Sequence, residues 1–483
     1  MSDTKDLKIL FVSSEVAPYA KSGGLGDVIG SLPQELKKYG VDVRVVLPKY
    51  KSIKLEDAPN YLDYFVVNLG WRKQSVSIFS IDKKDTEAIP TYLIENDYYF
   101  GREGFYGYHD DFERFAFFSK TSIEFLNNID FKPDIIHFND WQTAPACVYL
   151  KNYYSKYTFF SGIKTVFSIH NLQYQGIFGK DVLNGLDLDY NYGVVNNMEF
   201  YDHINYMKAG IIYSDAITTV SETYAEEIKT ARYGYGLDGV LRERSDKIIG
   251  ILNGIDNIEN NPETDTRIYK TFNKDTLHLK KENKTLLQRE LNLPERDVPM
   301  ISIISRLVDQ KGLDLVANCI EWLMKEDIQF VVLGTGDGRY EYMFKELQNR
   351  FPDKMSANIL FNSTLAQKIY ASSDLFLMPS LFEPCGLGQL FAMRYGTVPI
   401  VRNTGGLADT VNHYNESNTT GNGFVFNDYD CGGLMWAISE ALDAYSDSNK
   451  FNQVVKNAIE CDFSWSKSAE KYIKLYLELK DNK

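Results

Sequence analysis

The sequence predicts an α/β protein with two doubly wound domains. Apolar runs rich in β-branched residues recur along the 483-residue chain, helical stretches separate them, and a polar stretch interrupts the pattern near the middle. Such nearly continuous apolar runs are typical of parallel strands that are buried on both faces. Their alternation with helices predicts a doubly wound sheet in each half of the chain.

In the first half, we expect parallel strands at residues 8–15, 42–47, 134–139, 164–170, 215–220 and 247–252. Residues 63–95 alternate differently and predict a β-hairpin inserted in the same domain. This first domain is expected to span residues 1–257.

The second domain is expected to span residues 258–463. Residues 258–297 are rich in Asn, Lys, Glu and Thr, which indicates a linker followed by a first helix. The expected strands are 300–305, 329–333, 358–361, 375–379, 398–401 and 423–426. Ligands of such sheets bind at the carboxyl ends of the strands, and two facing domains would enclose a deep cleft suited to a ligand.

Composition excludes several classes of function. A net charge of −14 argues against a nucleic-acid or anionic-membrane partner. The polar residues 1–6 do not resemble a signal peptide, and no apolar run approaches the ~18 residues that span a bilayer. The five cysteines are scattered without a C-x-x-C pair, and the six histidines form no metal motif. We therefore expect a cytoplasmic protein with reduced thiols and no metal site.

A glycine-rich loop follows the first expected strand. Lys21, Gly23 and Gly24 precede a helical pattern that ends near Gly40. The free N–H groups of a helix start bind anions, and glycines can adopt positive φ and let a ligand approach the backbone. An ordinary turn that needs glycines explains the loop equally well. The loop is neither a Walker motif nor a dinucleotide fingerprint.

Polar clusters follow three other strands of the first half, at residues 137–142, 168–171 and 253–256. Each one alone fits a capping or turn role. Three of them at equivalent strand ends favour a binding site.

The second half carries cations and glycine-rich turns at its strand ends. Arg306 and Lys311 could grip a diphosphate through charge-assisted hydrogen bonds, although a solvated charged loop is the alternative. Glu383 precedes a Pro-Cys-Gly-Leu turn and could accept bonds from sugar hydroxyls. Cys385 lacks an evident histidine base, so we expect a packing or ligand-contact role rather than a nucleophile. Residues 403–411 repeat the loop-to-helix arrangement, and together these features indicate a nucleotide-diphosphate sugar.

Seven motifs resemble the bacterial glycogen synthase and plant starch synthase family. They are K-S-G-G-L-G-D-V, H-F-N-D-W, S-I-H-N-L, I-L-N-G-I-D, S-R-L-V-D-Q-K-G, S-L-F-E-P-C-G-L-G-Q-L and R-N-T-G-G-L-A-D-T-V, in the family's order and spacing. The resemblance implies a GT-B fold, in which two Rossmann-like domains face each other across a deep cleft. It also implies transfer of glucose from ADP-glucose to the non-reducing end of an α-1,4-glucan, with retention and without a metal or cofactor.

The resemblance also implies roles for individual residues. The catalytic residues would be His170 against the donor glucose, Arg306 and Lys311 at the diphosphate, and Glu383 at the glucose hydroxyls. Substrate-binding residues would be Lys21, Gly23, Gly24, Asp140, Trp141, Asn253, Phe361, Cys385, Gly386, Leu387, Thr404 and Gly405. Phe361 falls where relatives stack an aromatic ring, often tyrosine, on adenine. Residues 464–483 are expected to form a helix that returns to the first domain.

Two alternatives remain open at the level of sequence. One is another GT-B transferase that uses UDP-glucose, and the Lys21 loop together with the Glu383 motif argues against it. The other is a non-catalytic α-glucan-binding protein, which would be expected to lack Lys311, Glu383 or His170. The chain departs from related proteins at two places. Related GT-B transferases carry a second glutamate where this chain has Phe391. Residues 101–108 resemble a family loop but are shortened, which weakens an assignment of Tyr106 to glucan contact.

Overall fold

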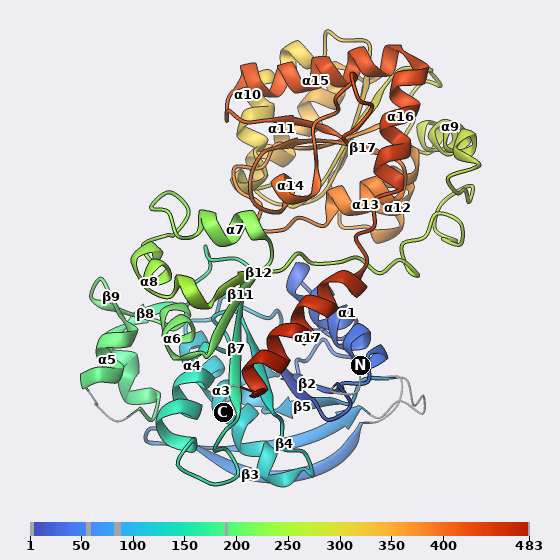
Figure 1. The fold of residues 1–483 in the computed structure, drawn as a ribbon. Helices are drawn as coiled ribbons and strands as arrows, with labels where there is room; N and C mark the ends of the chain where they lie inside the picture. The colour runs from blue at the N-terminus through green and yellow to red at the C-terminus, as the bar shows by residue number, and fades with distance from the viewer. Residues whose placement is uncertain (1–3, 55–58, 82–87, 189–191, 482–483) are drawn as a thin grey trace. The chain divides into compact units, whose positions relative to one another are not determined.

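The computed structural model describes residues 4–54, 59–81, 88–188 and 192–481. The first three residues of the polar N-terminal stretch lie outside the described residues. The chain forms two compact units: Met1–Gly254 with Trp465–Lys483, and Ile255–Ser464. Figure 1 shows an α/β arrangement of sheet and covering helices within each unit.

The first unit contains a nine-stranded sheet with the order β12-β11-β7-β6-β1-β2-β5-β4-β3. Its strands are β1 Lys8–Val12, β2 Asp42–Pro48, β3 Asn60–Leu69, β4 Arg72–Ile81, β5 Thr91–Glu95, β6 Ile135–Asn139, β7 Lys164–Ile169, β11 Ala216–Thr219 and β12 Ile248–Gly250. The six strands predicted for this half are confirmed as a continuous parallel set. The predicted hairpin is confirmed as β3 and β4, and β5 joins it to the parallel set by pairing with β2.

Helices cover this sheet, and the same unit contains a separate small sheet of three strands. The helices are α1 Gly24–Lys38, α2 Asp97–Phe100, α3 Asp111–Glu124, α4 Ala144–Tyr149, α5 Tyr192–Met198, α6 Tyr206–Tyr213, α7 Glu222–Glu227, α8 Asp238–Glu243 and α17 Trp465–Asp481. The small sheet consists of β8 Ile177–Gly179, β9 Glu199–Phe200 and β10 His203–Asn205. None of the described helices combines the length and the apolar character that a bilayer crossing requires.

Helix α1 forms because its apolar residues recur on one face. Leu25, Val28, Ile29, Leu32 and Leu36 are buried, and they follow the spacing of a helix that packs against a sheet. The chain leaves the helix at Gly40, whose φ of 86° lies in the left-handed region that favours glycine. The helix therefore begins at the glycine-rich loop and ends where the next strand starts.

The C-terminal helix α17 is held in the first unit by a buried polar contact. The Tyr476 hydroxyl lies 2.7 Å from His137 Nδ1, and His137 Nε2 lies 2.6 Å from the Ser168 hydroxyl. Burial lowers the pKa of His137 to about 3, so the ring is neutral at physiological pH. Lys480 pairs with Asp134 at 3.0 Å near the end of the same helix.

The second unit contains a six-stranded parallel sheet with the order β15-β14-β13-β16-β17-β18. Its strands are β13 Met300–Ile304, β14 Gln329–Leu333, β15 Met355–Asn358, β16 Leu375–Met378, β17 Val398–Arg402 and β18 Phe424–Phe426. Its helices are α9 Lys280–Glu290, α10 Leu313–Leu323, α11 Gly338–Arg350, α12 Ser363–Ser372, α13 Gly388–Arg394, α14 Gly405–Thr410, α15 Cys431–Ser446 and α16 Ser448–Ile459. Five of the six predicted strands are confirmed.

The strand predicted at 358–361 is wrong by about three residues. The observed strand β15 covers Met355–Asn358, and Asn362 caps the following helix by accepting a hydrogen bond from Leu365 N at 2.9 Å. β15 is an edge strand that pairs with β14 only, so it needs fewer apolar residues than a central strand. Phe361 consequently lies in the short loop between strand and helix, with 88% of its surface exposed.

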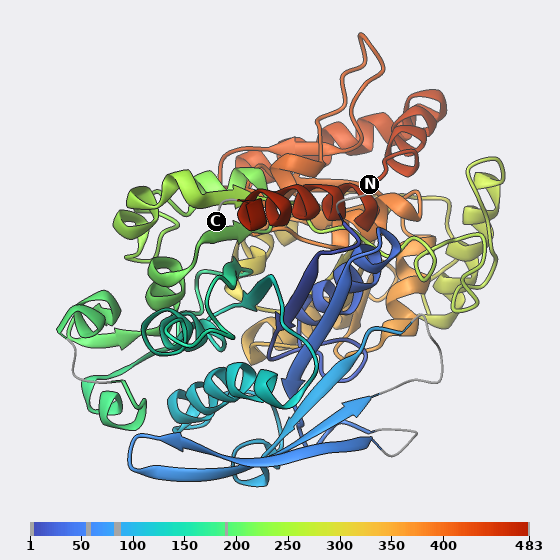
Figure 2. The same ribbon diagram turned by 60° about the horizontal axis from the view of Figure 1, so that its bottom comes forward.

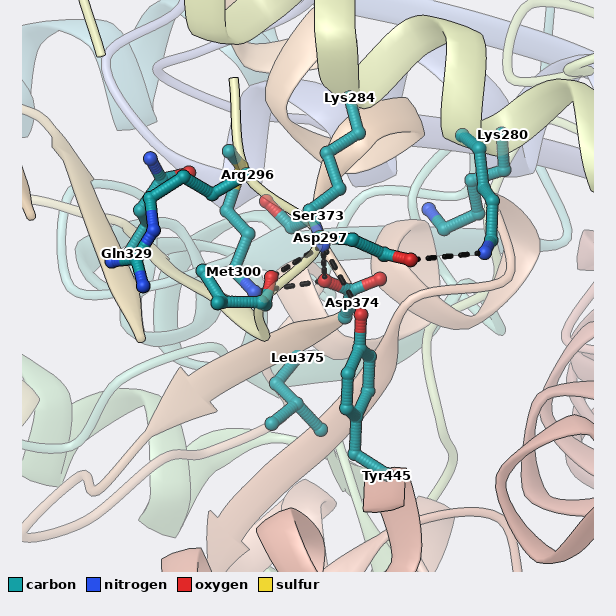
Figure 3. A network of polar contacts seen from close by, with 12 residues as sticks. Lys280, Lys284, Arg296, Asp297, Met300, Gln329, Ser373, Asp374, Leu375 and Tyr445 are labelled. Atoms are coloured by element: carbon teal, nitrogen blue, oxygen red, sulfur yellow. Dashed lines mark hydrogen bonds and ion pairs between the residues drawn. The ribbon is translucent and has the colours of Figure 1, made fainter. Parts of the chain in front are cut away.

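Two lysines of α9 fasten this helix to the amino ends of three strands. Lys284 Nζ lies 2.6 Å from Asp374 Oδ2, which also accepts a bond from Met300 N at 2.8 Å. Figure 3 shows these residues together. One helical turn earlier, Lys280 Nζ donates to the carbonyls of residues 370, 371 and 395 at 3.1 Å and to Thr397 Oγ1 at 2.7 Å. Burial lowers the pKa of Lys280 to about 7. Both lysines lie on one face of α9 because they are four residues apart.

Replacing Lys280 with Met should destabilise the second unit. The substitution keeps the apolar stem but leaves buried carbonyl oxygens without a donor, which costs about 1–3 kcal/mol. We expect a lower unfolding temperature in differential scanning calorimetry. The control is Lys281→Met on the same helix. That side chain is 77% exposed, and the substitution removes only an ion pair with Asp297 at 3.5 Å. Equal unfolding temperatures for the two variants would contradict this role of Lys280.

Candidate functional site

The candidate residues of the second unit gather at one edge of its sheet. Strands β13, β16 and β17 are neighbours and run in the same direction, so their carboxyl ends meet at one edge. The loops after them carry Arg306 and Lys311, Glu383, and Gly405 respectively. Phe361 follows the carboxyl end of β15 at the same edge, two strands away from β13. This is the edge at which ligands of doubly wound sheets bind.

A buried ion pair forms the centre of this edge. Lys311 Nζ lies 2.6 Å from Glu383 Oε2, and the Ser380 hydroxyl donates to the same oxygen at 3.0 Å. The side chains of Lys311 and Glu383 are only 18% and 6% exposed. Glu383 Oε1 has no hydrogen-bond partner among the described residues, so it can accept a further bond. The pair therefore offers a fixed cation and a fixed acceptor to a ligand.

Arg306 contributes a second positive charge at the same edge. It lies two residues after the end of β13, it is exposed, and its side chain makes no hydrogen bond or ion pair within the described part of the chain. A guanidinium presents several donors in a planar fork that matches phosphate oxygens. A guanidinium without a partner among the described residues, in the same segment after β13 as Lys311, makes this edge suitable for a diphosphate.

Glycines allow the loops of this edge to pack backbone against backbone. A Cβ on Gly405 would lie 2.0 Å from the Glu383 carbonyl oxygen, and one on Gly312 would lie 2.0 Å from the Pro379 carbonyl oxygen. Both residues have positive φ, 45° and 71°. Gly386 also has positive φ, 73°, and faces the Gln389 side chain. These glycines are required by the packing that brings the loops together.

Three further candidates lie in the same loops. Cys385 is 4% exposed and Thr404 is fully buried, immediately before α14. Leu387 precedes α13 and packs, partly buried, against a core cluster that contains Leu390 and Leu407. Their side chains are therefore largely committed to the loop structure, and what they offer a ligand is chiefly the backbone around them.

In the first unit, a glutamate organises the glycine-rich loop. Glu15 Oε2 accepts hydrogen bonds from Ser22 N at 2.5 Å and Gly23 N at 3.2 Å. Its Oε1 accepts from the Ser22 hydroxyl at 2.6 Å and from the Tyr106 hydroxyl at 2.7 Å. The Gly23 N–H is thus already used within the protein, and Gly24 is the first residue of α1. Lys21, at the start of the loop, pairs with Asp27 at 2.6 Å.

The glycines of this loop are not explained by turn geometry. Gly23 has an extended backbone with φ of −159°, and neither Gly23 nor Gly24 is among the residues with positive φ. A Cβ added to either residue would meet no atom within 4 Å. Neither glycine uses its freedom to adopt a positive φ, so the alternative of a turn that needs glycines loses its support. Open space beside the backbone at a helix start is what close approach of an anionic ligand requires.

Sequence analysis does not identify Glu15 as a candidate site residue, and it assigns Tyr106 only weakly. The first predicted strand, residues 8–15, includes Glu15, but β1 ends at Val12. The available signal was an acidic residue directly after an apolar strand and before a glycine-rich loop. Tyr106 is brought to Glu15 by its own loop, which Asp111 holds by accepting bonds from Gly107 N at 2.8 Å and Tyr108 N at 3.2 Å.

Asp140 and His170 lie together after neighbouring strands β6 and β7. Asp140 has a left-handed backbone, φ 57°, and its Oδ1 accepts a hydrogen bond from His170 N at 2.8 Å. His170 Nε2 lies 3.0 Å from Asn139 Oδ1, so Nε2 carries the proton and Nδ1 is an acceptor.

The protonation of these two residues follows from their environment. Burial lowers the pKa of His170 to about 4, so its imidazole is neutral at pH 7. Burial also raises the pKa of Asp140 to about 7, although the backbone N–H groups of His170 and Asn171 act in the opposite direction. The site therefore combines a neutral imidazole with a carboxyl group that titrates near neutral pH.

Trp141 and Asn253 differ in how much of their side chain is already used. Trp141 is 9% exposed and packs edge-on against Phe115, with ring centres 5.1 Å apart. A Cβ on Gly176 would lie 2.4 Å from the Trp141 ring, so this indole is tightly enclosed. Asn253 is 7% exposed, and its Oδ1 has no hydrogen-bond partner among the residues that the structure describes. A buried acceptor without a partner is costly unless a ligand or water donates to it.

Metal-binding groups are absent from the described residues: no three His, Cys, Asp or Glu side chains there are arranged to hold an ion.

Comparisons with known proteins agree on one family. A family profile described as starch synthase catalytic domain matches residues 8–243, and one described as glycosyl transferases group 1 matches residues 284–460. Glycogen synthase of Alkaliphilus metalliredigens is 51% identical over 480 residues, which cover 98% of this chain and 100% of that protein. Glycogen synthase of Clostridium perfringens is 51% identical over 484 residues, which cover 99% and 100%.

A solved structure is also similar over the whole length. The catalytic domain of starch synthase IV from Arabidopsis thaliana, bound to ADP and acarbose, has a TM-score of 0.89 and 35% identity. The match covers 99% of this chain and 100% of that one.

Asp140→Asn should change how stability depends on pH. Folding raises the pKa of Asp140 from 3.8 to about 7, so its contribution to stability is fully present below about pH 4 and is lost as the pH rises to 7. Asparagine also tolerates a left-handed backbone. We expect the unfolding temperature of the wild type, relative to the variant, to fall between pH 4 and 7 and then to level off. A difference that does not vary with pH would contradict the raised pKa.

Proposed function

The chain belongs to the family of glycogen and starch synthases, and we propose that it transfers glucose from ADP-glucose to the non-reducing end of an α-1,4-glucan, with retention of configuration. It is a glycosyltransferase, as the two matching profiles and the glycogen synthase relatives show. The observation that carries the proposal is the sheet edge whose loops carry the Lys311–Glu383 ion pair and Arg306, a guanidinium without a partner among the described residues. Cations of this kind suit a diphosphate leaving group.

In this proposal the second unit holds the donor. Arg306 and Lys311 bind the diphosphate and stabilise the charge that develops when the glycosidic bond to phosphate breaks, which is an electrostatic effect of fixed donors. Glu383 Oε1 accepts bonds from glucose hydroxyls, and the ring of Phe361 stacks on the adenine. The remaining proposed contacts of the donor in this unit are the backbone and side chains of Cys385, Gly386, Leu387, Thr404 and Gly405.

The first unit supplies groups around the reacting sugar. His170 lies against the donor glucose, and its neutral imidazole suits this place because the transition state of glycosyl transfer carries positive charge on the sugar. Asp140, Trp141 and Asn253 border the donor and acceptor sugars, and the unpartnered Asn253 Oδ1 would accept a sugar hydroxyl. Lys21, Gly23 and Gly24 adjoin the diphosphate, with the open space beside Gly24 admitting its oxygens.

Retention follows if the acceptor attacks from the face that the ADP leaves. The departing phosphate oxygen then takes the proton of the attacking hydroxyl, so the bond to phosphate breaks as the bond to the acceptor forms. Glu383 is engaged with Lys311 and Ser380, which suits binding of hydroxyls better than nucleophilic attack. We further propose that the enzyme works in the cytoplasm, where its five free cysteines stay reduced.

The donor is tested by following labelled glucose into glycogen from ADP-glucose and from UDP-glucose, with and without EDTA. Preferred transfer from ADP-glucose, unaffected by EDTA, is the expected result. Preference for UDP-glucose would remove the adenine role of Phe361. Glycogen binding without transfer from either donor would favour a non-catalytic α-glucan-binding protein.

Arg306→Ala should lower kcat by roughly 10²–10³, the usual effect of losing one preorganised donor. Because Arg306 is exposed and unpaired among the described residues, its loss should leave the unfolding temperature unchanged. Lys311→Ala should lower kcat at least as much, and it also leaves the Glu383 carboxylate buried without its cation. Lys325→Ala, at an exposed position of the same unit, is the control. Wild-type turnover in Arg306→Ala would refute the diphosphate assignment.

Gly24→Ala and Gly405→Ala should separate a glycine needed by a ligand from one needed by the fold. Alanine at position 24 has open space and no unfavourable φ, so the unfolding temperature should not fall, while the KM for ADP-glucose should rise. Alanine at position 405 would clash with the Glu383 carbonyl and should lower the unfolding temperature. Unchanged donor kinetics in Gly24→Ala would show that no ligand approaches this loop closely.

A further inference from the structure

A cavity lies in the second unit, away from the candidate site. Its volume is about 420 Å³, which is within the ~300–1,000 Å³ of small-molecule pockets. His413, Tyr414 and Phe424 are its aromatic residues, and Glu416, Glu440 and Lys450 are its charged ones. The loop that contains Glu416 projects from the second unit in Figure 2, where it is drawn in orange.

The cavity lies toward the opposite edge of the sheet from the donor-binding loops. His413 pairs with Gly423 just before β18 begins at Phe424, so this part of the cavity lies at the amino end of that strand. Helix α15 starts beyond the carboxyl end of β18 and runs back along it, which carries Glu440 toward the same amino end. Donor-binding loops follow the carboxyl ends of β13, β16 and β17. The cavity is therefore separate from them.

An exposed tryptophan stands beside the cavity in a fixed position. The ring of Trp436 stacks on the ring of His413, with centres 5.2 Å apart and planes at 11°. His413 is itself fixed, because its Nδ1 accepts a hydrogen bond from Val425 N at 3.1 Å and its ring meets Phe424 edge-on. Trp436 nevertheless leaves 50% of its surface exposed. The stack thus presents a rigid aromatic surface to solvent next to a hollow.

The charges around the cavity define the kind of ligand that fits. Lys450 pairs with Glu416 at 2.9 Å, and this bond, together with the nearby Glu440 carboxylate, raises its pKa. Two carboxylates against one paired lysine disfavour an anion such as a phosphate or nucleotide. An apolar ligand would leave these charged groups without partners. A neutral polyhydroxyl ligand fits, because carboxylates accept from hydroxyls and an aromatic face packs against the C–H groups of a sugar ring.

We propose that this cavity, with Trp436 at its rim, binds a segment of an α-1,4-glucan at a site separate from the transfer site. The inference rests on the proposed function, because an acceptor made of many identical sugars can occupy two sites of one enzyme at once. The second site would hold the polymer and raise the local concentration of its chain ends. Short acceptors, which cannot reach both sites, would gain nothing from it.

The test is binding of β-cyclodextrin, a ring of α-1,4-linked glucose that has no non-reducing end and cannot be elongated. Tryptophan fluorescence is titrated without donor, in the full-length wild type and in Trp436→Ala, Glu440→Ala and Trp322→Ala. Trp322 is the control, because it is 56% exposed on α10 of the same unit. Unfolding temperatures confirm that each variant is folded, and Glu440→Ala keeps the aromatic stack should Trp436→Ala fail to fold.

Trp436→Ala and Glu440→Ala should each weaken β-cyclodextrin binding about threefold to tenfold, the scale of one aromatic or hydrogen-bonding contact. They should raise the KM for glycogen while leaving kcat/KM for maltotriose and the KM for ADP-glucose unchanged. Wild-type binding of β-cyclodextrin by both variants would overturn the proposal. Binding that depends on Trp436 in a protein that transfers no glucose would uphold this site and refute the proposed function instead.

Discussion

Contacts between the backbones of neighbouring loops set the positions of Lys311 and Glu383 in the second unit. The Gly406 N–H donates to the Glu383 carbonyl at 3.0 Å, and Gly405 lies so close to the same carbonyl that no side chain fits. Gly312 packs in the same way against Pro379 and directly follows Lys311. The loops after β13, β16 and β17 are thereby joined into one layer. They carry Lys311 and Glu383, whose charged groups lie 2.6 Å apart.

The two cations of this layer differ in exposure: the charge of Lys311 is largely buried, and that of Arg306 is exposed. Lys311 is already paired with Glu383, so much of the cost of holding each charge away from water is offset before a ligand arrives. Arg306 keeps its full charge at the surface. A diphosphate could therefore bind to both cations. Arg306 would donate to it directly, and Lys311 would donate through the N–H groups that Glu383 does not use. Burial has the opposite effect on His170 in the first unit, because it lowers the pKa of that imidazole to about 4 and so keeps the ring neutral at pH 7.

Much of the fold could be predicted because strand-forming segments are encoded locally. Eleven of the twelve predicted parallel strands match observed strands, and the exception is the edge strand β15, whose sequence M-S-A-N carries little apolar signal. The places of Arg306, Lys311, Glu383 and His170 after strand ends also followed from this pattern. The conformations of Gly23 and Gly24 could not be predicted in this way. A sequence does not show whether a glycine is needed for its backbone freedom, for its small size or for the space that it leaves beside the backbone.

The sequence by itself determined the α/β fold class, the strand ends that carry polar residues and the resemblance to glycogen and starch synthases, since all three depend on patterns of neighbouring residues. Only the tertiary structure decided which groups meet. Glu15 joins Tyr106, 91 residues away, and His413 stacks on Trp436. Such contacts arise from the packing of whole elements, and their energies depend on distances and burial that no local pattern contains. For this reason the role of Glu15 in its loop and the cavity beside Trp436 became visible only in the folded chain.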